Sequence, residues 1–278
     1  MIKYRKKIKR GLLFLIMVFL SFVVNIPNIS MIGTALKPFG GYMSDKSLFP
    51  SNPDFSMLRK VLFETTFGRY LANSVFIALV VVVFCVVFAS CAGYALSRCR
   101  GKVFTGYTVF LLMLQMFPLV LVLIPLFWIF KTLGLVDNQL SVIICYISIN
   151  LPFATWMLKG FFDDISIDIE EAAFIDGCGY FKTMIKVMAP MAKPSIITVI
   201  LFNFLAFWNE YIIALTLMPG ASKTLPVGLV TLSKGQMAAA NYGQLYAGLV
   251  IVMLPTLILY IMVQKKLTQG MTLGGLKD

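Results

Sequence analysis

Six long apolar segments constrain this chain more than any other feature of its sequence. They lie roughly at residues 12–33, 73–97, 107–130, 140–158, 196–217 and 246–263. Each has about twenty residues, which is the length that an α-helix needs to cross the hydrocarbon core of a bilayer. The whole chain agrees, since 59% of its residues are hydrophobic and only 13% are charged. We therefore predict an all-α integral membrane protein with six transmembrane helices in a single transmembrane domain, residues 1–278.

The placement of basic residues predicts how these segments cross the membrane. The N-terminal run MIKYRKKIKR carries six basic residues and no acid. Ten more flank alternate ends of the later segments, at Arg98, Arg100, Lys102, Lys159, Lys182, Lys186, Lys193, Lys265, Lys266 and Lys277. Cytoplasmic loops carry an excess of Lys and Arg, so we expect both termini and the central loop in the cytoplasm. The net charge of +12 then reflects anchoring in the membrane and not nucleic-acid binding.

We read the first apolar segment as a retained span and not as a cleaved signal peptide. It continues well past the length of a typical signal-peptide core, and no clear A-x-A site follows it. Residues 34–71, with turn residues such as Gly40, and residues 219–242, with Gly235, are expected outside the membrane on the far side. The glycine-rich tail, residues 267–278, is expected in the cytoplasm.

The longest polar passage between apolar segments is residues 163–194. It holds six of the twelve carboxylates, at Asp163, Asp164, Asp168, Glu170, Glu171 and Asp176. The pattern predicts two short helices. Asp168 is the expected N-cap of the first, with Glu171 three residues later in a pattern like a capping box. Glu170 and Glu171 then lie in the first turn, where the helix dipole favours negative charge.

Small residues mark the second half of the first predicted helix. Ala173 and Gly177 are four residues apart, so they would share a face with Ala172 nearby and allow another surface to approach closely. Gly177 also permits a sharp turn. A second helical pattern starts at Tyr180, and Pro190 and Pro194 end it or begin the next membrane segment.

In this place in the chain, the order of residues resembles the cytoplasmic loop of ABC-importer permeases. The resemblance rests on Glu171, Ala172, Ala173 and Gly177, followed by Pro190 thirteen residues later. The family usually ends the pattern with Ile-x-Leu-Pro, whereas Val187, Met188 and Ala189 precede the proline here, so the leucine is missing. The wider context EEAAFIDG is similar to the carbohydrate-uptake branch, the class of the maltose-transporter permeases. Further similarity lies in NSVFIALV at residues 73–80, FWNEYI at residues 207–212 and the terminus at residues 271–278.

The resemblance implies a type I ABC-importer permease that carries a sugar or oligosaccharide. Glu170, Glu171, Ala172, Ala173, Gly177 and Pro190 would then form the contact with a separate ATPase dimer. It also implies a second, homologous permease, an extracellular or periplasmic solute-binding protein, and a place in the plasma membrane of a bacterium or archaeon. ATP and magnesium would be bound by the ATPase subunits, so no cofactor or metal is expected in this chain.

Polar residues inside the predicted spans are candidates for the substrate route. Tyr146 and Asn150 are four apart on one helix face. Glu210 is a carboxylate inside a span, which is costly unless it faces a cavity or a partner. Trp208 and Asn209 precede it, and the nearby aromatic rings of Phe207, Trp208 and Tyr211 could stack on a sugar. The same residues also fit two other interpretations, hydrogen bonds between helices and an aromatic belt at the membrane surface.

Several functional classes are disfavoured by what the sequence lacks. It contains no G-x-x-x-x-G-K-[ST] pattern, so the chain is not expected to be the ATPase itself. It has no histidine and no paired carboxylates within spans, which argues against a membrane-embedded enzyme. A secondary transporter usually buries several ionisable groups, and only Glu210 qualifies. A permease for a peptide, amino acid or polyol phosphate remains an alternative to the sugar prediction.

Overall fold

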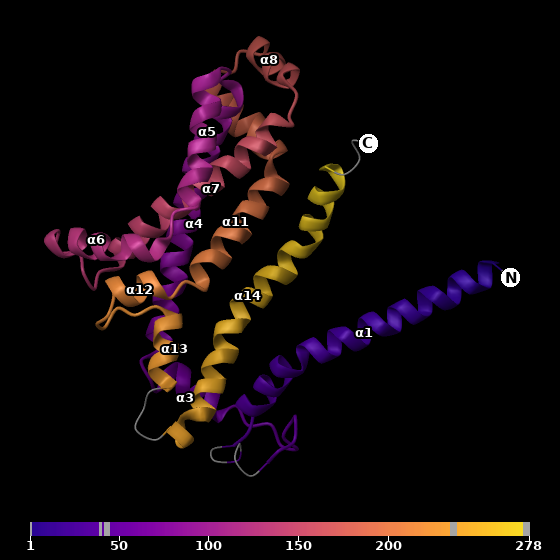
Figure 1. Cartoon of the computed structure of the whole chain (residues 1–278), viewed down its shortest axis with the longest axis vertical. Helices are drawn as coiled ribbons and strands as arrows, with labels where there is room; N and C mark the ends of the chain where they lie inside the picture. Colours follow the sequence, from indigo (N-terminus) through magenta and orange to yellow (C-terminus); the bar gives the residue numbers. More distant parts are fainter. Residues whose placement is uncertain (1, 39–40, 42–44, 234–237, 275–278) are drawn as a thin grey trace. The chain divides into compact units, whose positions relative to one another are not determined.

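The computed structural model describes residues 2–38, 41, 45–233 and 238–274, and within these ranges all regular secondary structure is helical (Figure 1). Gly40, Gly235 and residues 275–278, which entered the predictions above, lie outside the described residues. The chain groups into two compact units. The first comprises Met1–Gly68 and Leu229–Met253, and the second comprises Arg69–Gly228 and Leu254–Asp278. We describe each unit by itself.

The first unit contains the long helix α1 (Ile2–Ala35) and the short helix α3 (Ser56–Phe63). The predicted first span is confirmed as a helix, and its apolar part, Lys9–Ala35, is long enough to cross a membrane. No side chain in its most apolar stretch is buried within the protein, so this surface is suited to lipid or to another subunit. Lys37 follows α1, and its ammonium donates hydrogen bonds to the backbone carbonyls of Asp45 and Ser47. These bonds fix residues 45–47 next to the end of α1.

The second unit holds most of the other helices, and three of them continue into the first unit. The three shared helices are α4 (Phe67–Arg98), α13 (Leu225–Ser233) and α14 (Ala238–Gly274). The others are α5 (Lys102–Gln115), α6 (Leu119–Thr132), α7 (Gln139–Asp163), α8 (Ile167–Ile175), α9 (Tyr180–Thr183), α10 (Ala189–Met191), α11 (Lys193–Trp208) and α12 (Ile212–Leu217). Helix α7 is central, because α5 and α11 both pack against it (Figure 1).

Helices α1, α4, α7 and α14 lie at four of the predicted spans, and each contains a stretch long and apolar enough to cross a membrane. Two bent helix pairs bring the possible number among the described residues to six. The first pair, α5 and α6, corresponds to the predicted span at residues 107–130. It is not one helix, since its halves meet at 90°. Pro118 lies at the break as the N-cap of α6, where a proline cannot continue the preceding helix.

The predicted span at residues 196–217 is also interrupted. Helix α11 ends at Trp208 and α12 starts at Ile212, so Asn209, Glu210 and Tyr211 form a non-helical break. The second bent pair joins residues Tyr180–Met191 to α11 at an angle of 81°. Pro194 lies in the first turn of α11, where its missing N–H has no intrahelical partner to lose.

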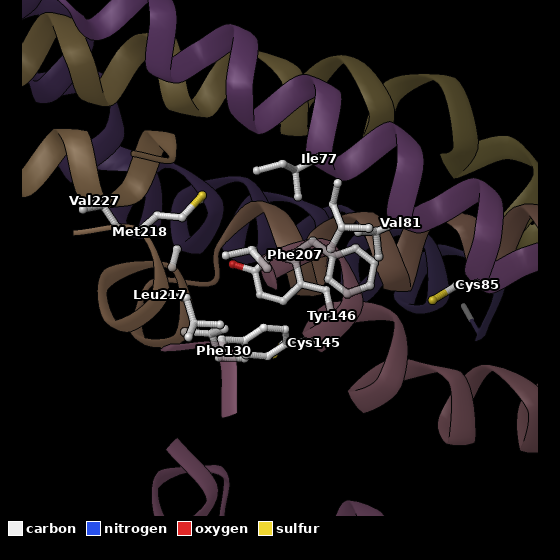
Figure 2. Packing of buried hydrophobic residues seen from close by; sticks show 14 residues of the cluster. Ile77, Val81, Cys85, Phe130, Cys145, Tyr146, Phe207, Leu217, Met218 and Val227 are labelled. Atoms are coloured by element: carbon white, nitrogen blue, oxygen red, sulfur yellow. The ribbon is translucent and has the colours of Figure 1, made fainter. Parts of the chain in front are cut away.

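Two buried clusters hold the second unit together. Figure 2 shows the first, in which Ile77 and Val81 of α4 lie near Tyr146 of α7 and Phe207 of α11. The second includes Ala89 of α4, Ala154 and Phe162 of α7, and Met188, which belongs to the polar segment at residues 163–194. Figure 1 shows α8 at one end of this unit and α6 and α12 at the other.

Small residues bring α4 into close contact with α7. Ala89 and Ser90 are buried, and Gly93 lies directly against α7. A Cβ added at Gly93 would lie 2.9 Å from the backbone nitrogen of Lys159 and 3.1 Å from the carbonyl oxygen of Thr155. The two helices therefore meet backbone to backbone at this point.

Candidate functional site: the polar segment at residues 163–194

The first predicted helix of the polar segment is present as α8, but its N-cap is Ser166 and not Asp168. The Ser166 hydroxyl accepts a hydrogen bond from the Asp168 backbone N–H at 3.3 Å and donates one to the Asp168 carboxylate at 3.0 Å. Ser166 has the extended backbone that a cap requires, and Asp168 already lies in the first helical turn. The predicted pairing of Asp168 with Glu171 in a capping box is therefore wrong.

Helix α8 ends at a glycine that the backbone requires. Gly177 has a φ of +81°, a conformation that residues with a Cβ adopt at a cost. Its N–H bonds to the carbonyl of Phe174 at 3.0 Å, and the N–H of Cys178 bonds to that of Ala173 at 3.0 Å. This pair of bonds is a Schellman cap, which satisfies carbonyls that the helix end leaves free. The turn predicted at Gly177 is confirmed.

The predicted small-residue face of Ala173 and Gly177 is wrong, because Gly177 lies beyond the end of the helix. The C-cap is Asp176, so Gly177 does not share a helical face with Ala173. Ala173 is buried against its own chain, whereas Ala172 and Gly177 are exposed. Nothing lies within 4 Å of a Cβ built at Gly177, so its role in this chain is conformational and not one of close packing.

The two adjacent glutamates of α8 face in different directions. Glu170 is 4% exposed and forms an ion pair with Arg98 at the end of α4. Its other carboxylate oxygen accepts a hydrogen bond from the Tyr94 hydroxyl at 2.5 Å. Glu171 is exposed. The sequence pattern treats the two residues alike, but only Glu171 is open to a partner.

The exposed side of the polar segment is apolar as well as charged. Ile175 is 86% exposed, Tyr180 75% and Phe181 69%. An open hollow of about 500 Å³ lies next to them, lined partly by Tyr180, Phe181 and Met184 and partly by the end of α4. Large exposed apolar side chains next to an exposed carboxylate are typical of a protein-binding surface.

The second predicted helix is present, but it contains a wide turn. Helix α9 leads into a π-helical turn, Met184–Met188, and then into α10. The Ala189 N–H bonds to the Met184 carbonyl, five residues back. Pro190 follows directly and has no N–H to offer the preceding turn. Pro190 lies exposed within α10. The prediction that Pro190 ends the helical run or starts the next membrane segment is therefore wrong.

The candidate substrate-route residues are only partly brought together. The Tyr146 hydroxyl donates to a Glu210 carboxylate oxygen at 2.6 Å, and the Tyr146 ring stacks on Phe207 with centroids 5.3 Å apart. Glu210 also accepts bonds from the backbone N–H groups of Ile213 at 2.8 Å and Ala214 at 3.2 Å. Glu210 thus lies in the break between helices, where it caps α12, and not within a continuous span as predicted.

The other three candidates bond or pack locally. The side-chain amide of Asn150 donates to the Tyr146 carbonyl at 3.1 Å, and that of Asn209 donates to the Leu205 carbonyl at 2.9 Å. Trp208 is 2% exposed and stacks on Phe204, so its ring is not open for stacking on a sugar within this chain. The interpretation of these residues as links between and within helices fits the geometry better than a row of route-lining groups.

Sequence reasoning missed Tyr94 and Arg98. The sequence marks Arg98 only as a basic residue at the end of a span, and it carries no local signal for Tyr94. Their partner Glu170 lies 72 residues after Arg98, so no local pattern connects them. Among the described residues, no group of three or more Cys, Asp or Glu side chains could hold a metal ion.

Comparison with known proteins identifies the family. The profile of the binding-protein-dependent transport system inner membrane component matches residues 86–272, which is more than half of the chain. The chain belongs to this family. The permease is 29% identical to the diacetylchitobiose uptake system permease protein NgcG of Streptomyces coelicolor over 259 residues, which cover 91% of this chain and 84% of that protein. It is 33% identical to the sulfoquinovosyl glycerol transport system permease protein SmoH of Agrobacterium fabrum over 230 residues, covering 82% and 80%.

Solved structures agree on the fold of the permease. A chain from a bacterial ABC transporter that imports the acidic polysaccharide alginate superimposes with a TM-score of 0.79 at 25% identity, covering 93% of this chain and 96% of that one. The all-α, type I ABC-importer permease fold predicted from the sequence is therefore confirmed, as is the resemblance to the carbohydrate-uptake permeases.

Proposed function

We propose that this permease is one of two homologous permease subunits of an ATP-driven importer for a sugar or oligosaccharide. A separate ATPase dimer supplies the energy, and an extracellular or periplasmic binding protein delivers the solute. Family membership supports the general transport role. The sugar substrate is supported by the relatives, whose names refer to diacetylchitobiose and sulfoquinovosyl glycerol, and by the alginate transporter with a similar fold.

The observation that carries the proposal is the form of α8. A nine-residue helix in a polar segment is capped at both ends, anchored by Glu170 on one side, and presents Glu171 and Ile175 on the other. Isolated helices of this length are marginal in water, so the chain holds α8 in place by tertiary contacts. We infer that the exposed side of α8 binds the ATPase, with Ala172, Gly177 and Tyr180 at its margin, and that ATP-dependent movement of the ATPase is passed to the spans through α8.

We further propose that both termini and the polar segment lie in the cytoplasm. The positive-inside distribution of Lys and Arg supports this orientation. It also places α8 on the side of the membrane where ATP is available. ATP and magnesium are bound by the ATPase in this proposal and not by the permease.

Purification of the tagged permease from its native membranes in mild detergent tests the proposal. We expect a P-loop ATPase and a second six-span permease to copurify in defined proportion. The complex, reconstituted in liposomes with its binding protein, is then tested for uptake of tritiated trehalose, diacetylchitobiose and galactooligosaccharides with and without ATP. ATP-dependent uptake of one of these sugars supports the proposal. Uptake by the permease alone without ATP would contradict it and indicate a secondary carrier.

A further inference from the structure

Three elements of the second unit meet at the Arg98 side chain. Its Nε pairs with the Glu170 carboxylate of α8. Its two terminal nitrogens donate to the carbonyl oxygens of Phe162, at 3.1 Å, and Ile165, at 3.4 Å, where α7 ends. Arg98 is itself the last residue of α4. One guanidinium therefore ties the ends of α4 and α7 to α8.

Both carboxylate oxygens of Glu170 accept hydrogen bonds from side chains of α4. One oxygen of Glu170 meets Arg98, and the other accepts the hydrogen bond of Tyr94, one turn earlier on α4. Tyr94 also packs edge-on against Phe162 with ring centroids 5.7 Å apart. A buried charge that loses its partner is strongly unfavourable, so the pair resists separation when α8 is displaced.

The connections on either side of α8 are short and non-helical, at residues 164–166 and 176–179. Without a further link, a force on α8 would be absorbed by bending of these connections. The cluster of Tyr94, Arg98 and Glu170 bypasses both of them, because it joins α8 directly to the ends of two long apolar helices.

We propose that Arg98 is a positioning residue for energy coupling, which clamps α8 through Glu170 to the ends of α4 and α7 so that the three move as one body. This inference rests on the proposed function, in which α8 receives the movement of the ATPase. The two adjacent glutamates then have different roles. Glu171 faces the ATPase, and Glu170 transmits the displacement of α8 to the ends of α4 and α7.

Conservative substitutions test whether the role of Arg98 depends on the geometry of its guanidinium or only on its positive charge. Arg98→Lys keeps the positive charge, but an ammonium on a single stem cannot reproduce the planar fork that reaches a carboxylate and two carbonyls together. Glu170→Gln keeps the shape and removes the charge. Arg100→Lys is the matched control, because Arg100 is exposed and lies two residues from Arg98. Tyr94→Phe removes only the hydroxyl and provides the variant with the least effect on folding.

The measurement is hydrogen exchange of the whole transporter complex in lipid nanodiscs, with and without ATP and vanadate. In the wild-type complex, we expect trapping to change exchange both in α8 and at the ends of α4 and α7. In Arg98→Lys and Glu170→Gln, the response of α8 remains, while the response at the ends of α4 and α7 falls about tenfold, the size of a typical coupling between sites. Tyr94→Phe gives a smaller fall, and Arg100→Lys gives none.

The outcomes distinguish this inference from the proposed function. If the wild-type complex shows no ATP-dependent uptake, the proposed function fails. If the wild type transports and every assembled variant, Tyr94→Phe included, keeps the wild-type response at the ends of α4 and α7, the clamp is refuted. A loss of activity that only follows the amount of intact complex, with the response of each assembled complex unchanged, also refutes it.

Discussion

At the scale of single residues, neighbours in the sequence have opposite roles. Glu170 and Glu171 have the same chemistry, yet one is buried in a cluster with Arg98 and the other is exposed. Glu210 shows a related contrast. As an acid in an apolar segment it was predicted to face a cavity or partner, and its carboxylate is instead shared between Tyr146 and two backbone N–H groups.

Gly177 should tolerate only residues that accept a left-handed backbone. Gly177→Val is expected to weaken the end of α8 by about 1–2 kcal/mol, because a Cβ is unfavourable at positive φ. Gly177→Asn is the matched control, since Asn enters this conformation more easily. The amount of ATPase that copurifies with each variant measures the effect. Equal recovery with Val and Asn would contradict a conformational role for Gly177.

Glu210→Ala should destabilise the permease itself. It leaves the Tyr146 hydroxyl buried without its acceptor and removes the cap of α12, with an expected cost of about 1–3 kcal/mol. Thermal unfolding of the purified protein in detergent measures this loss. Asn209→Ala is the control, since Asn209 is exposed and bonds only to its own helix. If Glu210→Ala had unchanged stability and weaker sugar binding, the interpretation of Glu210 as a route residue would be supported instead.

At the scale of helices, the contact between α4 and α7 depends on the absence of a side chain at Gly93. Gly93→Ala places a Cβ against backbone atoms of α7 that cannot move independently of their helix. We expect a loss of about 1–3 kcal/mol of stability from this overpacking, measured by thermal unfolding. Gly160→Ala, on α7 with nothing within 4 Å, is the control and should be neutral or stabilising. A stable Gly93→Ala variant would show that the helices can separate there at little cost.

The sequence predicted the long helices well, because a run of apolar residues is itself the signal for a span. Prediction from the sequence was wrong where a side chain's hydrogen bonds, and not the apolar pattern, decide where a helix begins or ends. The segment at residues 196–217 is mostly apolar and long enough for one span, yet the helix breaks where Glu210 caps a second helix with its own side chain. Asp168 fits the N-cap preference as well as Ser166 does, and only the backbone decides between them. The partners of Glu170 are on another helix, so no local pattern could have identified them.

At the scale of the whole molecule, the orientation in the membrane is open to a direct test. A variant that retains Cys99 as its only cysteine reports on the connection between α4 and α5, where Cys99 is exposed. We expect a membrane-impermeant maleimide to label it in inside-out vesicles and not in intact cells. A cysteine at Leu133, which is 63% exposed at the end of α6, should give the reverse result. Labelling of Cys99 in intact cells would reverse the proposed topology.

The capping of α8 at both ends has a consequence for how this segment can change. Ser166 and Gly177 fix where the helix starts and stops, and successive residues of a helix are rotated by about 100° around its axis. Loss or gain of one residue between Ser166 and Glu170 would turn the remainder of α8 by that angle and direct Glu170 away from Arg98. The spacing between these two residues is therefore as restricted as their identities. A substitution in α8 changes one side chain, whereas an insertion or deletion changes the direction of every residue beyond it.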